Sequence, residues 1–149
     1  MGFETTRKGT RGARAPRGVL LKWANRMTVK RIRGKKDGDM LVLTTVGRKS
    51  GLTRETPVRY FPDGEDAWLI VASANGAVAN PAWYLNLAAQ PDVTIEVGGR
   101  KVSVTATQLG GAEREQAWQR ITSAAPRFAG YQEKTDRELP VIRLAERAA

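Results

Sequence analysis

The feature of this sequence that most constrains its fold is a pair of alternating segments joined by two glycines. Apolar and polar residues alternate over residues 93–97 and again over residues 102–106. A period of two residues is typical of β-strands that bury one face, and Gly98-Gly99 suits the tight turn of a hairpin. The chain is therefore expected to contain an antiparallel sheet.

Further strand-like runs and two helical patterns extend this hairpin into a larger fold. Apolar and β-branched runs occupy residues 40–46, 55–61, 67–73 and 139–144. Helices are expected after Asn80, as N-cap, with Pro81 as first residue, and over residues 112–124. Strands in this order need no long parallel crossover, which disfavours a Rossmann fold. The sequence predicts a mainly β (α+β) domain, a small antiparallel barrel with appended helices.

Two shorter segments qualify this arrangement. Pro57 lies within the second strand-like run, which predicts an edge position or a bulge because proline has no backbone N–H. Residues 126–131 begin with a proline and are expected to end the third helix and to expose Phe128 and Tyr131.

The N-terminal region is expected to have two parts that differ from the body. Residues 1–16 are basic, with little to bury, and predict a flexible tail. Residues 17–34 predict a basic amphipathic helix, because Val19, Trp23 and Met27 recur at four-residue spacing. That apolar face either packs on the body or lies on an anionic bilayer surface. Residues 35–149 form the expected barrel domain.

Charge and composition exclude several classes of function. Residues 1–36 hold 12 Lys and Arg and one Glu, a net charge of +11, whereas the rest holds 13 basic and 14 acidic residues, a net charge of −1. The body is thus near neutral, and no specific nucleic-acid binding is expected. The chain has no Cys and no His, so no metal site or His-based hydrolase is expected. An enzyme of this composition needs an organic cofactor for its chemistry.

No membrane-spanning run or signal peptide is visible, and a cytoplasmic location is expected.

Between the first two strand-like runs lies a loop rich in cations and glycines. It carries Arg48, Lys49, Ser50, Gly51 and Arg54. Hydroxyls, exposed backbone N–H groups and fixed positive charge suit a phosphate or a carboxylate. An ordinary hairpin turn with solvated cations explains the same residues.

Three motifs taken together resemble one enzyme family. They are Gly47-Arg48-Lys49-Ser50-Gly51 with Arg54, residues 80–87 (NPAWYLNL), and Tyr131 followed by Thr135-Asp136-Arg137. Their order and spacing over residues 18–145 resemble the deazaflavin-dependent nitroreductases, or F420-dependent quinone reductases. The resemblance implies a split β-barrel, similar to FMN-binding and pyridoxamine-phosphate-oxidase-like barrels. Split barrels often dimerise, so a homodimer is expected by analogy.

The resemblance also implies roles for individual residues, because coenzyme F420 carries a phosphate and an anionic glutamate tail. Arg48, Lys49 and Arg54 would pair with the tail, and Ser50 and Gly51 would donate to the phosphate. The flat ring would lie among Pro57, Val58, Ser73, Ala74 and Trp83. The hydride acceptor would lie near Arg59, Phe128, Tyr131 and Lys134. Tyr131 is the expected catalytic residue, as a hydrogen-bond or proton donor.

The implied activity is hydride transfer from reduced F420 to a quinone, a nitroaromatic compound or an activated alkene. Two alternatives stay open from the sequence: an FMN-binding reductase on the same barrel, and a lipid-binding or nucleic-acid-binding module that acts through residues 1–36. Deleting residues 1–36 is expected to leave cofactor binding intact if the chain is the F420-dependent enzyme.

Overall fold

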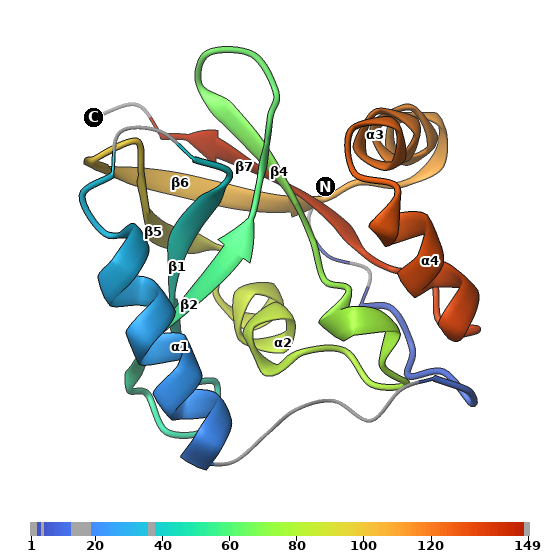
Figure 1. Ribbon diagram of the computed structural model, residues 1–149, viewed down its shortest axis with the longest axis horizontal. Helices are drawn as coiled ribbons and strands as arrows, with labels where there is room; N and C mark the ends of the chain where they lie inside the picture. Colours follow the sequence, from blue (N-terminus) through green and yellow to red (C-terminus); the bar gives the residue numbers. More distant parts are fainter. Residues whose placement is uncertain (1–2, 4, 13–18, 36–37, 148–149) are drawn as a thin grey trace.

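The fold is built on one curled antiparallel sheet, and this computed structural model describes residues 3, 5–12, 19–35 and 38–147. The strands are β1 (Met40–Val46), β2 (Thr53–Arg59), β3 (Phe61–Pro62), β4 (Ala67–Val71), β5 (Asp92–Val97), β6 (Arg100–Gln108) and β7 (Val141–Glu146). Their order is β2-β1-β5-β6-β7-β4-β3, and every neighbouring pair is antiparallel. The expected mainly β class with appended helices is confirmed (Figure 1).

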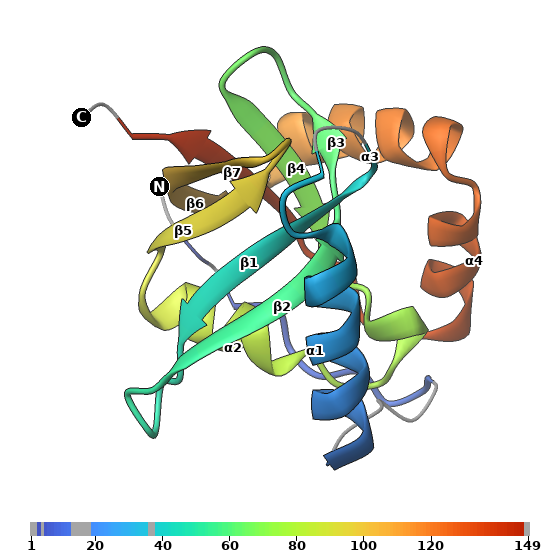
Figure 2. The ribbon, with the colours of Figure 1, turned by 60° about the vertical axis from the view of Figure 1, so that its left-hand side comes forward.

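Helices cover both faces of this sheet. They are α1 (Val19–Ile32), the 3-10 turn η1 (Ala74–Gly76), α2 (Ala82–Ala89), α3 (Gly111–Ala124) and α4 (Arg127–Lys134). Tyr84 and Leu87 of α2 are fully buried in the core that Leu41, Ile95 and Leu144 form inside the curled sheet. A second core joins α3 and α4 to β3, β4 and β7, and α1 runs along β2 (Figure 2).

The hairpin predicted from alternation is present as β5 and β6. Val93 is paired with Val104 and Ile95 with Val102, and all four side chains are buried. Each apolar residue therefore faces the core, as the two-residue period requires.

The segment after α3 differs from its prediction. The helix does not simply end at Pro126, because α4 starts at Arg127. Phe128 is 5% exposed and packs edge-on against Phe61 at 5.7 Å, so the prediction that it is exposed was wrong. Tyr131 is half-buried, one helical turn away on the same face.

The start of α2 is also displaced from its prediction. The helix begins at Ala82, with Pro81 rather than Asn80 in the capping position. The Asn80 side chain is engaged elsewhere: its amide donates to the Thr6 carbonyl at 2.7 Å, and its oxygen accepts from Arg137 at 2.7 Å. Long-range partners therefore override the local capping preference.

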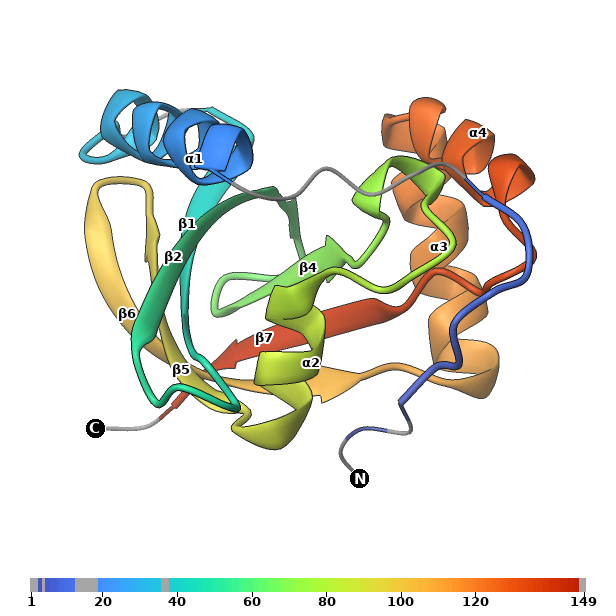
Figure 3. The ribbon, with the colours of Figure 1, turned by 90° about the horizontal axis from the view of Figure 1, so that it is seen from below.

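The N-terminal residues 5–12, here called the strap, lie against the body (Figure 3). The Gly9 N–H donates to the Val78 carbonyl at 2.8 Å, and the Asp136 carboxylate accepts from the backbone N–H groups of Thr10 and Arg11. These bonds hold a segment for which the sequence predicts flexibility. The prediction used only local composition, whereas the partner Asp136 comes from the other end of the chain. Residues 1–2, 4 and 13–16 of the expected tail lie outside the described residues.

Helix α1 packs on the sheet, but not by the apolar face that the sequence pattern identified. Val29 is 4% exposed, whereas Leu20, Trp23 and Met27 are 85%, 63% and 52% exposed. Of the two alternatives left open by the sequence, the face with Trp23 and Met27 therefore does not pack on the body: the helix buries the side that faces β1 and β2. Within the described residues, no helix is long and apolar enough to cross a membrane.

Candidate functional site

A pocket of about 210 Å³ opens where the two ends of the curled sheet approach each other without pairing. It brings together eight of the predicted ring and acceptor residues: Pro57, Val58, Arg59, Ser73, Ala74, Trp83, Phe128 and Tyr131. Val71, Asn75 and Arg127 complete its lining. The lining residues come from β2, β4, η1, α2 and α4, and Figure 1 labels four of these elements: β2, β4, α2 and α4.

The first wall of the pocket is the edge strand β2. Pro57 lies opposite Val42 of β1. Because β2 is the first strand of the sheet, no further strand needs a backbone N–H on its other side. The predicted edge position of Pro57 is confirmed. Val58 points into the core, and Arg59 forms an ion pair with Asp39 at 3.3 Å.

The opposite wall is a tight turn after β4. Ala74, Asn75 and Gly76 all have positive φ, at 45°, 57° and 78°. Such values are unfavourable for the first two residues and need support from their surroundings. Gly76 also packs against α4, because a Cβ there would lie 2.6 Å from the Tyr131 carbonyl oxygen.

That support comes from Arg137, which is 2% exposed. Its guanidinium donates to the carbonyls of Ala72, Ser73 and Ala77 at 3.0–3.1 Å, and to the Asn80 side chain at 2.7 Å. All four acceptors are neutral, and burial lowers the pKa of the group. Sequence reasoning included Arg137 in a motif but missed its role, since its partners lie 57 to 65 positions away.

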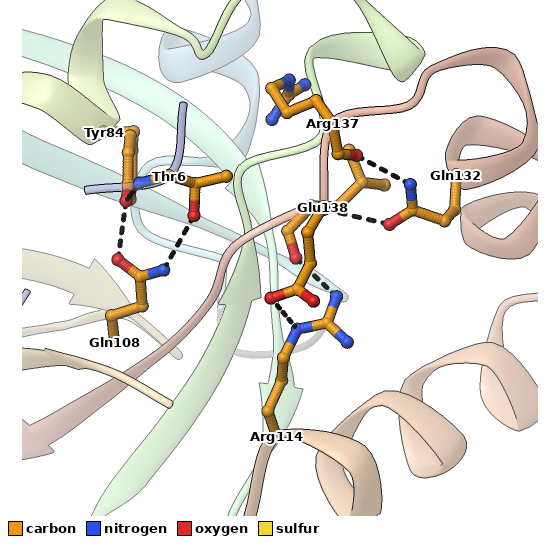
Figure 4. A network of polar contacts seen from close by, with 8 residues as sticks. Thr6, Tyr84, Gln108, Arg114, Gln132, Arg137 and Glu138 are labelled. Carbon is orange, nitrogen blue, oxygen red and sulfur yellow. Dashed lines mark hydrogen bonds and ion pairs between the residues drawn. The ribbon is translucent and has the colours of Figure 1, made fainter. Parts of the chain in front are cut away.

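A clamp from α4 holds Arg137 in place. The Gln132 side chain donates to the Arg137 carbonyl at 2.7 Å and accepts from the Leu139 N–H at 3.0 Å (Figure 4). Because Gln132 is next to Tyr131, this clamp also orients the helix that presents Tyr131 to the pocket.

Tyr131 has an aromatic and cationic environment. Its ring packs edge-on against Phe128 at 5.4 Å, and the Lys134 ammonium lies 5.7 Å from the ring centre. Within the described part of the chain, its hydroxyl makes no hydrogen bond. Lys134, a predicted acceptor contact, lies over this ring and does not line the pocket.

A second hollow of about 480 Å³, here called the groove, adjoins the pocket at Trp83, which lines both. Strands β1 and β2 contribute Thr44, Thr45, Thr53, Arg54, Glu55 and Thr56; α2 adds Ala82 and Asn86; and α1 adds Lys22, Asn25 and Arg26. Of these, the sequence pointed only to Arg54 and Trp83.

The loop between β1 and β2 approaches the groove only through Arg48. Both the backbone N–H and the guanidinium of Arg48 donate to the Asn86 side chain, at 3.1 and 3.2 Å. Lys49, Ser50 and Gly51 lie exposed at the tip of the turn and line neither hollow. The Ser50 hydroxyl accepts from the Leu52 N–H at 3.2 Å, so it helps to close the turn.

The two hollows differ in chemistry. The pocket combines aromatic and apolar side chains with two arginines, Arg59 and Arg127. The groove has no aromatic side chain other than the shared Trp83, and it gathers Lys22, Arg26 and Arg54, which form no ion pair among the described residues. The Thr45 hydroxyl is buried there without a hydrogen-bond partner in the same part of the chain. Together they fit a planar ring that carries an anionic chain.

Comparisons with known proteins agree with this geometry. The family model for F420H(2)-dependent quinone reductase matches residues 20–146. An F420H(2)-dependent quinone reductase of Mycobacterium tuberculosis H37Rv is 42% identical over 110 residues, which cover 72% of this chain and 73% of that protein.

Solved structures are similar as well. An F420-H2 dependent reductase (FDR-A) has a TM-score of 0.67 at 36% identity and covers 74% of this chain and 96% of its own. A protein described as a domain-swapped dimer has a TM-score of 0.67 at 32% identity, covering 85% and 99%. The expected split-barrel likeness is confirmed by a protein of the pyridoxinephosphate oxidase family from Clostridium acetobutylicum, at a TM-score of 0.51 and 11% identity, covering 85% and 84%. That last likeness concerns the fold alone.

Proposed function

The chain belongs to the F420H(2)-dependent quinone reductase family, and from this premise we propose that it reduces a quinone with coenzyme F420. The observation that supports the proposal is that eight residues implied by the family resemblance line one pocket. That pocket adjoins a groove whose cations form no ion pair among the described residues. Relatives named for F420 are 36–42% identical to this chain, which favours F420 over the alternative cofactor FMN.

The residues of the pocket would bind the ring and shield it from water. When bound, reduced F420 supplies the hydride. Pro57 and Val58 of the pocket lining would hold the ring from β2, while Trp83 and the turn at Ser73-Ala74 would hold it from the opposite wall. Holding donor and acceptor in van der Waals contact replaces a bimolecular encounter with a positioned one.

Tyr131 would assist the acceptor. A quinone becomes a hydroquinone by gaining a hydride and a proton, and charge develops on its oxygen during the transfer. The Tyr131 hydroxyl, free of other hydrogen bonds within the described residues, can donate to that oxygen. Arg59 and Phe128 line the same pocket as the tyrosine and would shape the space for the acceptor, whereas Lys134 would act on the tyrosine ring from outside the pocket lining.

The test is a cofactor titration followed by an acceptor assay. We expect F420 fluorescence to be quenched on binding, FMN to bind more weakly, and reduced F420 to be oxidised in the presence of menadione. Absence of F420 quenching at low salt would exclude the proposal. A protein that is yellow as purified and releases FMN would instead support the alternative cofactor.

We also propose that α1 contacts an anionic membrane at the cytoplasmic face. Leu20, Trp23 and Met27 form an exposed apolar stripe, and Lys30 and Arg31 lie beside it. Apolar residues flanked by cations suit the boundary between headgroups and acyl chains of anionic lipids. Residues 17–18 of this predicted segment lie outside the described residues.

Vesicle sedimentation tests this contact. We expect binding to vesicles that contain phosphatidylglycerol and little binding to phosphatidylcholine alone. Trp23→Ser should weaken the binding, whereas Trp118→Ser, in α3, should leave it unchanged. Equal binding of Trp23→Ser and the unmodified protein would contradict the role of this stripe.

For oligomeric state, the related domain-swapped dimer supports the proposal of a homodimer. Sedimentation velocity without lipid distinguishes a dimer from a monomer.

A further inference from the structure

We propose that helix α1 forms part of the cofactor site, with Lys22 and Arg26 binding the anionic tail of the coenzyme in the groove. The inference rests on the proposed function and adds residues that no motif pointed to. The groove passes from Trp83, which it shares with the pocket, along β2 to α1. A coenzyme whose ring lies in the pocket can therefore extend its anionic tail along the groove.

The spacing of the α1 residues matches this role. Lys22, Asn25 and Arg26 are separated by three and four positions, so they share one side of the helix. All three line the groove, while Leu20 and Met27 do not. One helix thus presents Lys22 and Arg26 to the groove and its apolar stripe to the outside.

The position of β2 leaves room for a ligand. As the edge strand of the sheet, it pairs only with β1, so the backbone groups along its other side have no partner strand. Figures 2 and 3 show α1 along this strand and α2 beneath it. Backbone N–H groups and the hydroxyls of Thr53 and Thr56 are suitable donors for carboxylates and phosphate.

The charge of the groove favours an anion. Its only acid is Glu55, and Arg33 binds that carboxylate while also donating to Glu96 at 2.6 Å. Glu55 is thereby neutralised from outside the groove. Lys22, Arg26 and Arg54 keep their positive charge without an ion pair among the described residues. A chain of carboxylates would supply the missing countercharge.

This assignment reverses an expectation from the sequence. The sequence predicted that an F420-dependent enzyme of this kind would keep its cofactor binding when residues 1–36 are deleted. Because α1 lines the groove, we expect removal of its cations to weaken F420 binding.

The experiment compares two ligands and two double variants of the full-length chain. The ligands are F420 and the deazaflavin riboside that lacks the phosphate and glutamates. The test variant is Lys22→Ala with Arg26→Ala. The matched control is Arg7→Ala with Lys8→Ala, which removes the same charge from exposed positions that line neither hollow.

We expect the test variant to bind F420 about 10- to 100-fold more weakly, as for the loss of charge-assisted contacts. Its affinity for the riboside should be unchanged, and the control should bind both ligands like the unmodified protein. Thermal unfolding of both variants at the unmodified midpoint shows that the fold is intact.

The outcomes separate this inference from the proposed function. If the unmodified protein binds neither ligand, the proposed function fails. If it binds both and the test variant retains full F420 affinity, only the role of α1 is overturned. An equal loss for both ligands would also overturn it, because it would indicate damage to the ring pocket instead of the tail contacts.

Discussion

At the scale of single residues, the site depends most on Arg137 and Tyr131, which have different roles. Arg137 contacts only protein, and it fixes the turn that forms one wall of the pocket. Tyr131 has a hydroxyl without a protein partner among the described residues, so it is available to a ligand. The first residue therefore matters for structure and the second for turnover.

Arg137→Met should destabilise the protein. The substitution leaves buried carbonyl oxygens without donors, and each orphaned acceptor costs about 1–3 kcal/mol. Urea unfolding should show this loss, and Arg100→Met, at an exposed position of β6, is the control. Equal unfolding midpoints for the two variants would show that the buried hydrogen bonds contribute little.

Tyr131→Phe should lower turnover with little change in F420 affinity. The ring and its packing on Phe128 stay, but the hydrogen bond to the acceptor is lost, and kcat should fall about tenfold or more. Steady-state oxidation of reduced F420 by menadione measures it. Tyr60→Phe is the control, because that hydroxyl bonds to the Gly38 carbonyl. Full activity of Tyr131→Phe would remove the proposed role.

At the scale of elements, two connections decide how the site is assembled. The β1–β2 turn is closed by its own backbone: the Gly47 N–H donates to the Leu52 carbonyl, and the Gly51 N–H donates to the Gly47 carbonyl, both at 2.8 Å. Gly51 needs its positive φ of 74° for this turn. The strap is the second connection: Asp136 holds Thr10 and Arg11, and further hydrogen bonds join Gly9 to Val78 and Thr6 to Asn80.

The positions of Arg54 and Lys49 predict which of the two substitutions weakens cofactor binding more. Arg54→Ala should weaken F420 binding by about 1–3 kcal/mol, the range for contacts with charged groups, because Arg54 lines the groove. Lys49→Ala should have a smaller effect, since Lys49 lies exposed at the tip of the turn. Fluorescence titration measures both. A larger effect of Lys49→Ala would place the tail at the turn instead of the groove.

The strap should detach at low pH. Hydrogen bonds from Thr10 and the Arg11 backbone lower the pKa of Asp136 to about 2. A depressed pKa means that these bonds stabilise the fold above the unfolded pKa, near 4, and are lost as pH falls toward 2. The protection factor of the Gly9 amide, which compares its exchange with the intrinsic rate at each pH, should therefore fall over this range.

The same contact can be tested at neutral pH. Asp136→Asn should speed tryptic cleavage after Arg7 and Lys8, because the carboxylate that holds the strap is gone. Asp66→Asn, in the turn before β4, is the control. Cleavage of both variants at the unmodified rate would indicate that the strap is held by other contacts.

At the scale of the whole molecule, the unpaired ends of one curled sheet create the site. The strands β2 and β4 contribute to the same pocket without being neighbours in the sheet. Helices then close the opening: α2 from within, α4 from one side, and α1 along the edge strand. Of the cations of the N-terminal region, α1 brings Lys22 and Arg26 to the groove.

This distribution of charge predicts that F420 affinity depends on salt. Because the body is near neutral, raising NaCl to about 0.5 M should weaken F420 binding mainly by screening the cations of the groove. The riboside without phosphate and glutamates should be insensitive. Isothermal titration over a salt series tests this, and equal salt dependence of both ligands would contradict tail recognition by charge.

Much of the fold was predictable from local patterns. Alternation identified β5 and β6 because a two-residue period follows directly from strand geometry. The absence of Cys and His excluded metal sites built on those ligands and histidine-based catalysis. Element ends were less accurate. The run over 55–61 divides into β2 and β3, and the last strand is Val141–Glu146 where 139–144 was expected, because pairing with neighbours sets where strands end.

The sequence by itself determined the antiparallel sheet, the family resemblance and most residues of the pocket, since these depend on local pattern and motif spacing. Only the tertiary structure decided the contacts between distant segments. In it, Arg137 holds the turn that forms one pocket wall, and Asp136 binds the strap. Lys22 and Arg26 line the groove. Hydrogen bonds and charges of this kind depend on where the chain folds back on itself, and no local period encodes that.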